Sequence, residues 1–254
     1  METRSAVRRT CLIGGGLLLL LAGLLLMWRL AYRPAEEHRA AAPSSPAVAL
    51  PGLPTAPAPQ DDPPASAGVG TPIDLSASYN AGMGHAVSMD TKEHPNNLGE
   101  FPTGEHEFAG VKFAVQGVIH LGSIYPKVVQ GIPVGVRCQR LHLLHGTAGT
   151  TTEGAPCAVL TLHYADGSTA ELPINYGEHL RDWWNWKAKE PTALDPGTEI
   201  AWWGDNDFAR ARKCRLRVYR STFANPKPDQ AIETIDYAKQ TPRCNPFLLG
   251  LSIE

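Results

Sequence analysis

Motifs that bind metals or carry catalytic chemistry are lacking in this sequence. Its 254 residues include five cysteines, but none are spaced as C-x-x-C, which argues against a zinc–thiolate site. There is also no G-x-S-x-G, no H-E-x-x-H and no glycine-rich phosphate loop. The sequence therefore predicts a protein that is not an enzyme, with no cofactor and no bound metal.

Charge is also sparse, and no stretch has the pattern of a long amphipathic helix. Charged residues make up 19% of the chain and the formal net charge is −2, so no nucleic-acid partner is expected. The 24 glycines and 22 prolines disfavour long helices and favour many turns.

Residues 11–28 form a long, leucine-rich apolar run without a charged side chain. As a helix, about 18 residues extend about 27 Å, which is enough to cross the hydrocarbon core of a bilayer. Three arginines lie within residues 1–10, which favours a cytoplasmic N-terminus. We expect a single-pass, uncleaved signal anchor that places the remaining chain outside the cytoplasm. A cleaved signal peptide is the alternative, although Ala40–Ala42 is a poor cleavage site.

Residues 29–72 are rich in proline and alanine. Such a segment buries too little apolar surface to offset the entropy of ordering it, so we expect a disordered, partly extended linker. It could be a stalk that holds a domain away from the bilayer, or a connector whose length has no role. Both interpretations remain open.

Residues 73–254 contain short runs in which apolar and polar side chains alternate. Val111, Phe113 and Val115 alternate with polar or small residues, and three later runs, within 170–174, 214–218 and 247–253, do the same. A period of two with one apolar face predicts half-buried antiparallel strands. Several such strands separated by turns predict an all-β domain, and we expect a β-sandwich of the jelly-roll type.

Five stretches of this domain carry a resemblance to a known family. They read IDLSASYN (73–80), EFAGVKFAVQGVIHL (107–121), YPKVVQGIPVGVRCQRLHLLHGT (125–147), LHYADGSTAELPINYGEHLRDWW (162–184) and ANPKPDQAIETIDY (224–237). Together they resemble bacterial extracytoplasmic β-sandwich domains of the galactose-binding-like kind, which are related to carbohydrate-binding modules. The resemblance implies the fold and a role in binding sugars or surfaces. It implies no particular ligand or catalytic residue.

The domain contains four cysteines, an even number that permits two disulfides outside the cytoplasm. A hairpin of residues 136–145 with residues 157–165 would place the first two cysteines opposite each other. The alternative is four reduced cysteines that fill the core as small apolar side chains. The expected pairs are Cys138–Cys157 and Cys214–Cys244.

Five of the six tryptophans lie within about twenty residues. Flat aromatic rings cover the apolar faces of sugars, while polar neighbours bind the hydroxyl groups. In extended geometry Trp184 and Trp186 share one face, with Trp183 on the other. The alternative is that the rings fill the core. The candidate ligand-binding residues are Trp184, Trp186, Trp203, Asp182 and Asp205.

Two polar pairs invite a metal-binding interpretation that the spacing does not favour. On a strand, His142 and His145 face opposite ways, so we expect them to be structural. Asp205 and Asp207 could bind calcium, but such residues more often form turns. A further stripe, Lys213, Arg215 and Arg217, is expected on a solvent-exposed strand face.

These features together predict a membrane-anchored, extracytoplasmic binding module, with carbohydrate as the first candidate ligand. One alternative is a noncatalytic structural or assembly protein of the cell envelope that docks onto another protein. A third is a small membrane-tethered glycosidase or esterase that uses carboxylates such as Glu171, Glu178 and Asp182. Exposed tryptophans would favour the first, and a flat apolar patch the second.

Overall fold

The computed structural model describes residues 68–87, 96–122, 124–186 and 194–254. All of them belong to one compact unit, Asp61–Glu254. The predicted cytoplasmic N-terminus, the predicted anchor and most of the predicted linker lie outside the described residues. Within the described ranges, no helix is both long enough and apolar enough to cross a bilayer.

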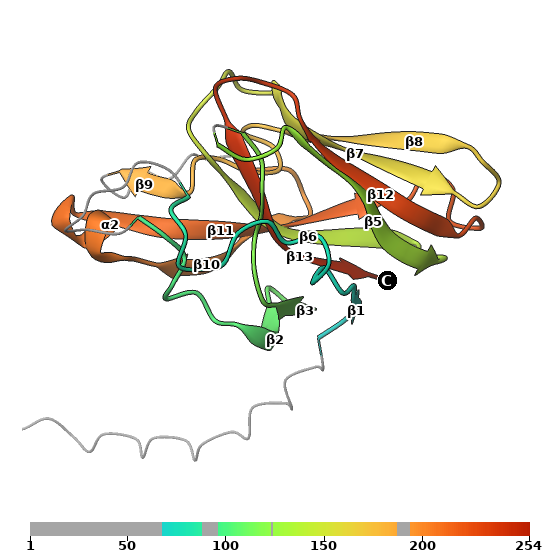
Figure 1. The fold of residues 1–254 in the computed structure, drawn as a ribbon, viewed down its shortest axis with the longest axis horizontal. Coiled ribbons are helices and arrows are strands. Elements are labelled where there is room, and N and C mark those ends of the chain that lie inside the picture. The colour runs from blue at the N-terminus through green and yellow to red at the C-terminus, as the bar shows by residue number, and fades with distance from the viewer. Residues whose placement is uncertain (1–67, 88–95, 123, 187–193) are drawn as a thin grey trace, which may run out of the picture. The chain divides into compact units, whose positions relative to one another are not determined.

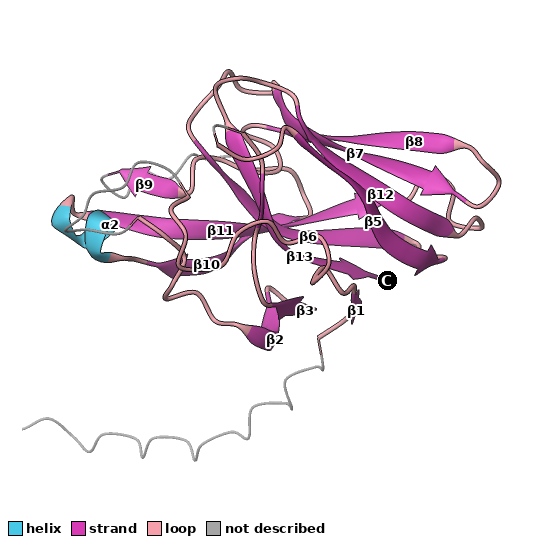
Figure 2. Ribbon diagram, viewed as in Figure 1, coloured by secondary structure: helices cyan, strands magenta, loops and turns pink. Residues whose placement is uncertain are grey.

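The regular elements of the described chain are antiparallel strands, apart from one short helix (Figure 2). One sheet contains β1 (Thr71–Pro72), β4 (Ile119–His120), β6 (Arg140–Ala148), β9 (Trp184–Trp186), β10 (Thr198–Gly204), β11 (Cys214–Ala224) and β13 (Asn245–Ile253). A second contains β5 (Val128–Val136), β7 (Pro156–Tyr164), β8 (Thr169–Asn175) and β12 (Ile232–Lys239). The strands β2 (Gly104–Phe108) and β3 (Val111–Val115) form a separate hairpin, and α2 (Asp207–Ala211) is a short helix.

The strand order joins segments that are far apart in the sequence. The seven-stranded sheet runs β1-β13-β6-β11-β10, with β4 also paired to β13 and β9 also paired to β11. The four-stranded sheet runs β5-β12-β7-β8 (Figure 1). The predicted all-β class is confirmed.

The main core lies between the two sheets, as in a β-sandwich. Leu141 and Leu143 of β6 are fully buried in one cluster with Leu160 and Leu162 of β7 and Tyr237 of β12. Because successive side chains of a strand point to opposite faces, these alternate positions fill the space between the sheets. Burial of this apolar surface is the main contribution to folding.

A second core covers the other face of the seven-stranded sheet. Leu144 of β6 and Leu249 of β13 pack there with Phe113 of β3, Phe208 of α2 and Trp183. The hairpin, the helix and nearby loops form a third layer over the sheet. The expectation of a half-buried strand with one polar face is therefore wrong for β13, in which all residues but the first are buried. In β6, too, all residues but the first are buried.

Three further expectations concern the alternation in β3, the start of the domain and the pairing of β6 with β7. The alternating run of β3 is confirmed, with Val111, Phe113 and Val115 buried. Thr71 and Pro72, the last two residues of the predicted linker, pair with β13. The predicted hairpin of residues 136–145 with 157–165 is wrong, because β6 pairs with β11 and β13 whereas β7 pairs with β8 and β12.

Candidate functional site

Trp184, the first of the predicted ligand-binding tryptophans, is in the second core. Its side chain is only 5% exposed, and its ring centroid lies 5.1 Å from that of Phe208 and 6.5 Å from that of Trp183. Trp183 is fully buried and also packs edge-on against Phe247. The two neighbouring tryptophans therefore enter the same core instead of facing opposite ways. The side chain of Trp186 lies outside the described part of the structure.

Trp203 is on the opposite face of the sheet. It is aligned with Arg217 of β11, whereas the preceding Trp202 is aligned with Val218 and packs against the second core. Trp203 is partly exposed, and the exposed Arg215 places its guanidinium carbon 4.8 Å from the ring centroid. Of the predicted tryptophans whose side chains are described, Trp203 is thus the one that presents ring surface to solvent.

The two predicted aspartates have different surroundings. Asp182 Oδ1 accepts hydrogen bonds from the backbone N–H groups of Gly149, at 3.3 Å, and Trp184, at 3.4 Å. Burial raises the pKa of Asp182 above its ordinary value. Asp205 is exposed and pairs with Arg210. The structure therefore does not bring the four predicted residues whose side chains are described into one site.

The Asp205–Asp207 segment is a helix start. Asn206 is the N-cap residue of α2, and its side-chain oxygen accepts a hydrogen bond from Ala209 N at 2.8 Å. Arg210 forms ion pairs with Asp205 and Asp207, and this cation occupies the space between the carboxylates. These contacts agree with the turn interpretation and leave little reason for calcium to bind there.

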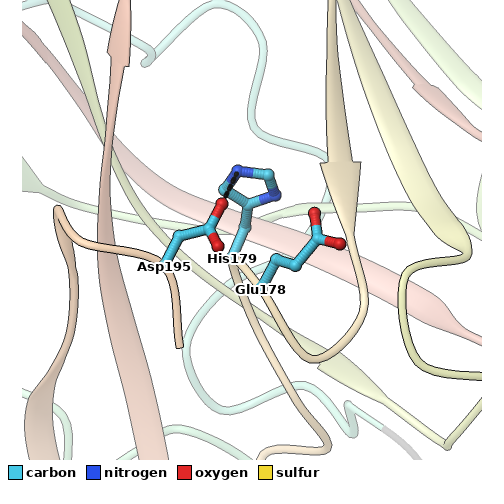
Figure 3. A group of neighbouring side chains, drawn as sticks. All are labelled: Glu178, His179 and Asp195. Carbon is cyan, nitrogen blue, oxygen red and sulfur yellow. Dashed lines mark ion pairs between the residues drawn. The ribbon is translucent and has the colours of Figure 1, made fainter. Parts of the chain in front are cut away.

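Sequence reasoning missed a cluster of Glu178, His179 and Asp195, in which one oxygen or nitrogen from each residue lies within 4.8 Å of the others (Figure 3). His179 stands between the two carboxylates, and its Nε2 is 3.6 Å from Asp195 Oδ2. The loops that carry these residues are tied together, because Asp195 N donates to Glu178 O at 3.0 Å. Nothing in the sequence signals this approach across 16 positions.

The donor set of one imidazole and two carboxylates is one that divalent metals accept, but the hydrogen bonds do not fit a metal centre. The backbone N–H of Asn175 donates to His179 Nδ1 at 2.9 Å. Neutral imidazole then carries its proton on Nε2, so neither nitrogen has a free lone pair for a metal. Glu178 is also engaged, since its Oε2 accepts a hydrogen bond from Asn175 Nδ2 at 2.7 Å. The cluster is a network that holds two loops together.

Beneath this cluster is a fully buried histidine–serine pair. His145 Nε2 is 2.9 Å from Ser221 Oγ, and Ser221 Oγ donates to the carbonyl of His179 at 2.7 Å. Thr198 Oγ1 also donates to Ser221 Oγ. A serine beside a histidine can be a nucleophile and its base, but both residues are 0% exposed. A substrate cannot reach them, so the pair is part of the core. His142 instead contacts Thr222 on the opposite face, as the strand period predicted.

All four cysteines of the domain are free and buried thiols. The side-chain amide of Asn225 donates to Cys138 O at 2.9 Å and accepts from the Tyr164 hydroxyl at 2.6 Å. Cys138 therefore lies near the end of β7, whereas Cys157 lies near its beginning, roughly 20 Å away at the rise of a strand. Cys214 belongs to the second core and Cys244 to the main core. The structure brings neither expected pair together.

The expected cationic stripe is only partly on the surface. Lys213 and Arg215 are exposed, but Arg217 is 5% exposed. Its Nε donates to the carbonyl of Asp182 at 3.0 Å, which ties β11 to the segment before β9. The prediction of a solvated face is thus wrong for Arg217, because a loop covers that side of the strand.

In comparisons with known proteins, no family model matches the chain and no curated protein matches it. The resemblance to galactose-binding-like domains therefore rests on the sequence stretches that carry it. The described part of the chain is an antiparallel β-sandwich, and Trp203 is partly exposed there, unlike the buried Trp184.

Proposed function

We propose that this chain is a membrane-anchored, extracytoplasmic binding module that recognises carbohydrate and performs no catalysis. The strand order supports a jelly roll. With β4, β5, β6, β7, β8, β11, β12 and β13 taken as eight successive strands, one sheet has the order first-eighth-third-sixth and the other second-seventh-fourth-fifth. That pairing scheme is the one expected for a jelly roll of two interleaved Greek keys.

The observation that carries the ligand class is the setting of Trp203. The Arg215 guanidinium lies over its partly exposed ring, near the end of β10. A ring of this kind stacks on the apolar face of a pyranose, and a neighbouring cation donates hydrogen bonds to hydroxyl or carboxylate groups of the sugar. Asp205 follows two residues later, and its side chain, which is 41% exposed and pairs with Arg210, adds an acceptor. This combination favours a polar or acidic glycan.

The lack of catalysis is supported by how the titratable groups are used. Catalytic groups must converge on a space that a substrate can enter. The His145–Ser221 pair is enclosed, and Asp182 and Glu178 accept hydrogen bonds from neighbouring N–H groups. Among the described residues, these partners support structural roles for the groups that a hydrolase would need.

A glycan array probed with the purified full-length chain tests this proposal. We expect binding that Trp203→Ala abolishes and Trp203→Phe, which keeps an aromatic ring, weakens to a smaller extent. Ile124→Ser is the matched control, since its side chain is 90% exposed and is remote in sequence from Trp203. Binding that survives Trp203→Ala in a folded variant would contradict the site, and no binding to any glycan would contradict the ligand class.

A second candidate function, docking onto an envelope protein, is favoured by one apolar edge. β5 is the edge strand of the four-stranded sheet, and Val128 and Val136 at its ends are 41% and 42% exposed. Pro133 lacks an N–H, so a partner would contact side chains here instead of extending the sheet. Loss of an envelope partner on Val128→Glu, together with a blank glycan array, would favour this function over sugar binding.

A further inference from the structure

Two cysteines that the sequence did not pair lie together in the main core. Cys157 is in β7, and its carbonyl accepts a hydrogen bond from Gln240 N at 2.9 Å, just beyond the end of β12. The chain then makes a short turn and reaches Cys244 only four residues later. Cys157 and Cys244 are both 0% exposed, and both belong to the cluster between the sheets.

The side chains of these two residues interact directly. The two thiols lie close enough to perturb each other: contact with Cys244 raises the pKa of Cys157, and contact with Cys157 lowers the pKa of Cys244. The Cys244 sulfur also lies 3.8 Å from the carbonyl oxygen of Gly149. Two thiols in contact inside a core need only a small adjustment to reach the bond length of a disulfide.

We propose that Cys157 and Cys244 form a disulfide that links the four-stranded sheet to the start of β13 in the seven-stranded sheet. The inference rests on the proposed extracytoplasmic location, because disulfides persist in oxidising compartments. The bond closes a loop of 87 residues, and long loops gain the most from such a cross-link.

The other two cysteines remain reduced in this scheme. Cys138 lies beside Asn225, whose amide is 3.9 Å from its sulfur. Cys214 is in the second core, beyond the seven-stranded sheet, and its thiol donates to the carbonyl of Arg212. Packed side chains separate each of them from the Cys157–Cys244 pair. Cys138 and Cys214 should therefore stay reduced, and they serve as controls within the same chain.

The oxidation is a thiol–disulfide exchange with a disulfide oxidant such as oxidised glutathione. One protein thiolate attacks the oxidant, forms a mixed disulfide and releases one glutathione thiolate. The second protein thiolate then attacks the protein sulfur of the mixed disulfide, which forms the Cys157–Cys244 bond and releases the second glutathione thiolate. The two protein thiols lose two protons and two electrons, and one glutathione disulfide becomes two thiols. Contact with Cys244 and burial raise the pKa of Cys157, so the exchange belongs to a stage before the core has closed.

The test is peptide mapping of the full-length chain after oxidation. Reduced protein is incubated with oxidised glutathione in urea at a concentration that lets the core open, then returned to buffer and alkylated after complete denaturation. We expect one cross-linked peptide pair, Cys157 with Cys244, two hydrogens lighter than the free peptides, with Cys138 and Cys214 alkylated. Alkylation of all four cysteines, or a cross-link to Cys138 or Cys214, overturns the proposal.

Thermal unfolding gives an independent readout of the same bond. We expect Tm to fall by roughly 5–15 °C when a reductant is added to the oxidised protein. Cys138→Ala should keep this redox-dependent shift, and Cys157→Ala should remove it. An equal shift in both variants overturns the proposed pairing. Alkylation in intact cells separates the two proposals, since a bond that forms in vitro but not in cells contradicts the location and leaves the pairing established.

Discussion

Acidification should destabilise this fold strongly, and His145 is the residue through which the effect is best measured. Ser221 Oγ uses its proton on the His179 carbonyl, so His145 Nε2 must be the donor in the 2.9 Å contact between them. Nδ1 of His145 then bears a lone pair, and it has no hydrogen-bond partner among the described residues. Burial lowers the pKa of His145 from 6.5 to about 3, because an imidazolium there would be a desolvated charge.

The sign and size of the effect follow from proton linkage. The unfolded chain binds a proton at His145 below its ordinary pKa of 6.5, while the folded chain does not until about pH 3. Stability is therefore intact above pH 6.5 and falls as the pH drops through the interval between the two values. From pH 8 to pH 5 the loss is about 2 kcal/mol for this one group. His120, whose pKa burial lowers to about 4, adds a similar loss.

The assay is urea unfolding, followed by tryptophan fluorescence, at pH 8 and pH 5. Most carboxylates have ordinary pKa values near 4, so between pH 8 and pH 5 the change in stability comes mainly from histidines. His145→Gln retains a hydrogen-bond donor but cannot titrate, and we expect its loss of stability between the two pH values to be about 2 kcal/mol smaller than that of the wild type. The exposed His106→Gln should lose as much as the wild type. Equal losses in wild type and His145→Gln would refute the assignment of a buried, neutral imidazole.

Two further predictions compare matched pairs of variants by urea unfolding. Trp184→Ala should cost about 3–5 kcal/mol because it opens a cavity in the second core, whereas Trp203→Ala on the surface should cost less than about 1 kcal/mol. Equal losses of stability in the two variants would contradict the difference in burial between Trp184 and Trp203. Gly149 has φ of 93°, and a Cβ there would lie 2.4 Å from a backbone carbonyl oxygen; Gly167 has φ of 78° with open space around it. Gly149→Ala should therefore unfold at much lower urea than Gly167→Ala, which should lose only about 1–2 kcal/mol to backbone strain.

Local structure could be predicted from the sequence where one strand face is apolar. The alternation in β3 correctly identified the buried positions. The segment Asp166-Gly167-Ser168, whose residue types are typical of turns, joins β7 to β8, with Asp166 accepting a hydrogen bond from Ser168 N. These features depend only on neighbouring residues. A period of two indicates which side chains of a strand share a face, whatever the rest of the fold is.

Pairings between distant segments could not be predicted in the same way. The near-continuous burial of β6 and β13 depends on a third layer contributed by β2, β3 and α2, and no local pattern reveals that layer. The contact between Cys157 and Cys244 likewise depends on which strands join which sheet. The hairpin expected from proximity in sequence led to a different cysteine pairing for this reason.

The contrast between Trp202 and Trp203 shows how a single irregularity decides the candidate binding surface. The register of β10 against β11 shifts between Ile200 and Trp202, so Ile200 packs on the main core while Trp202 packs on the second core. In a regular strand both would point the same way, and Trp203 would then face the second core. The bulge instead turns Trp203 toward the outer surface beside Arg215. The proposed sugar platform thus depends on one extra residue in one strand, which periodicity alone does not reveal.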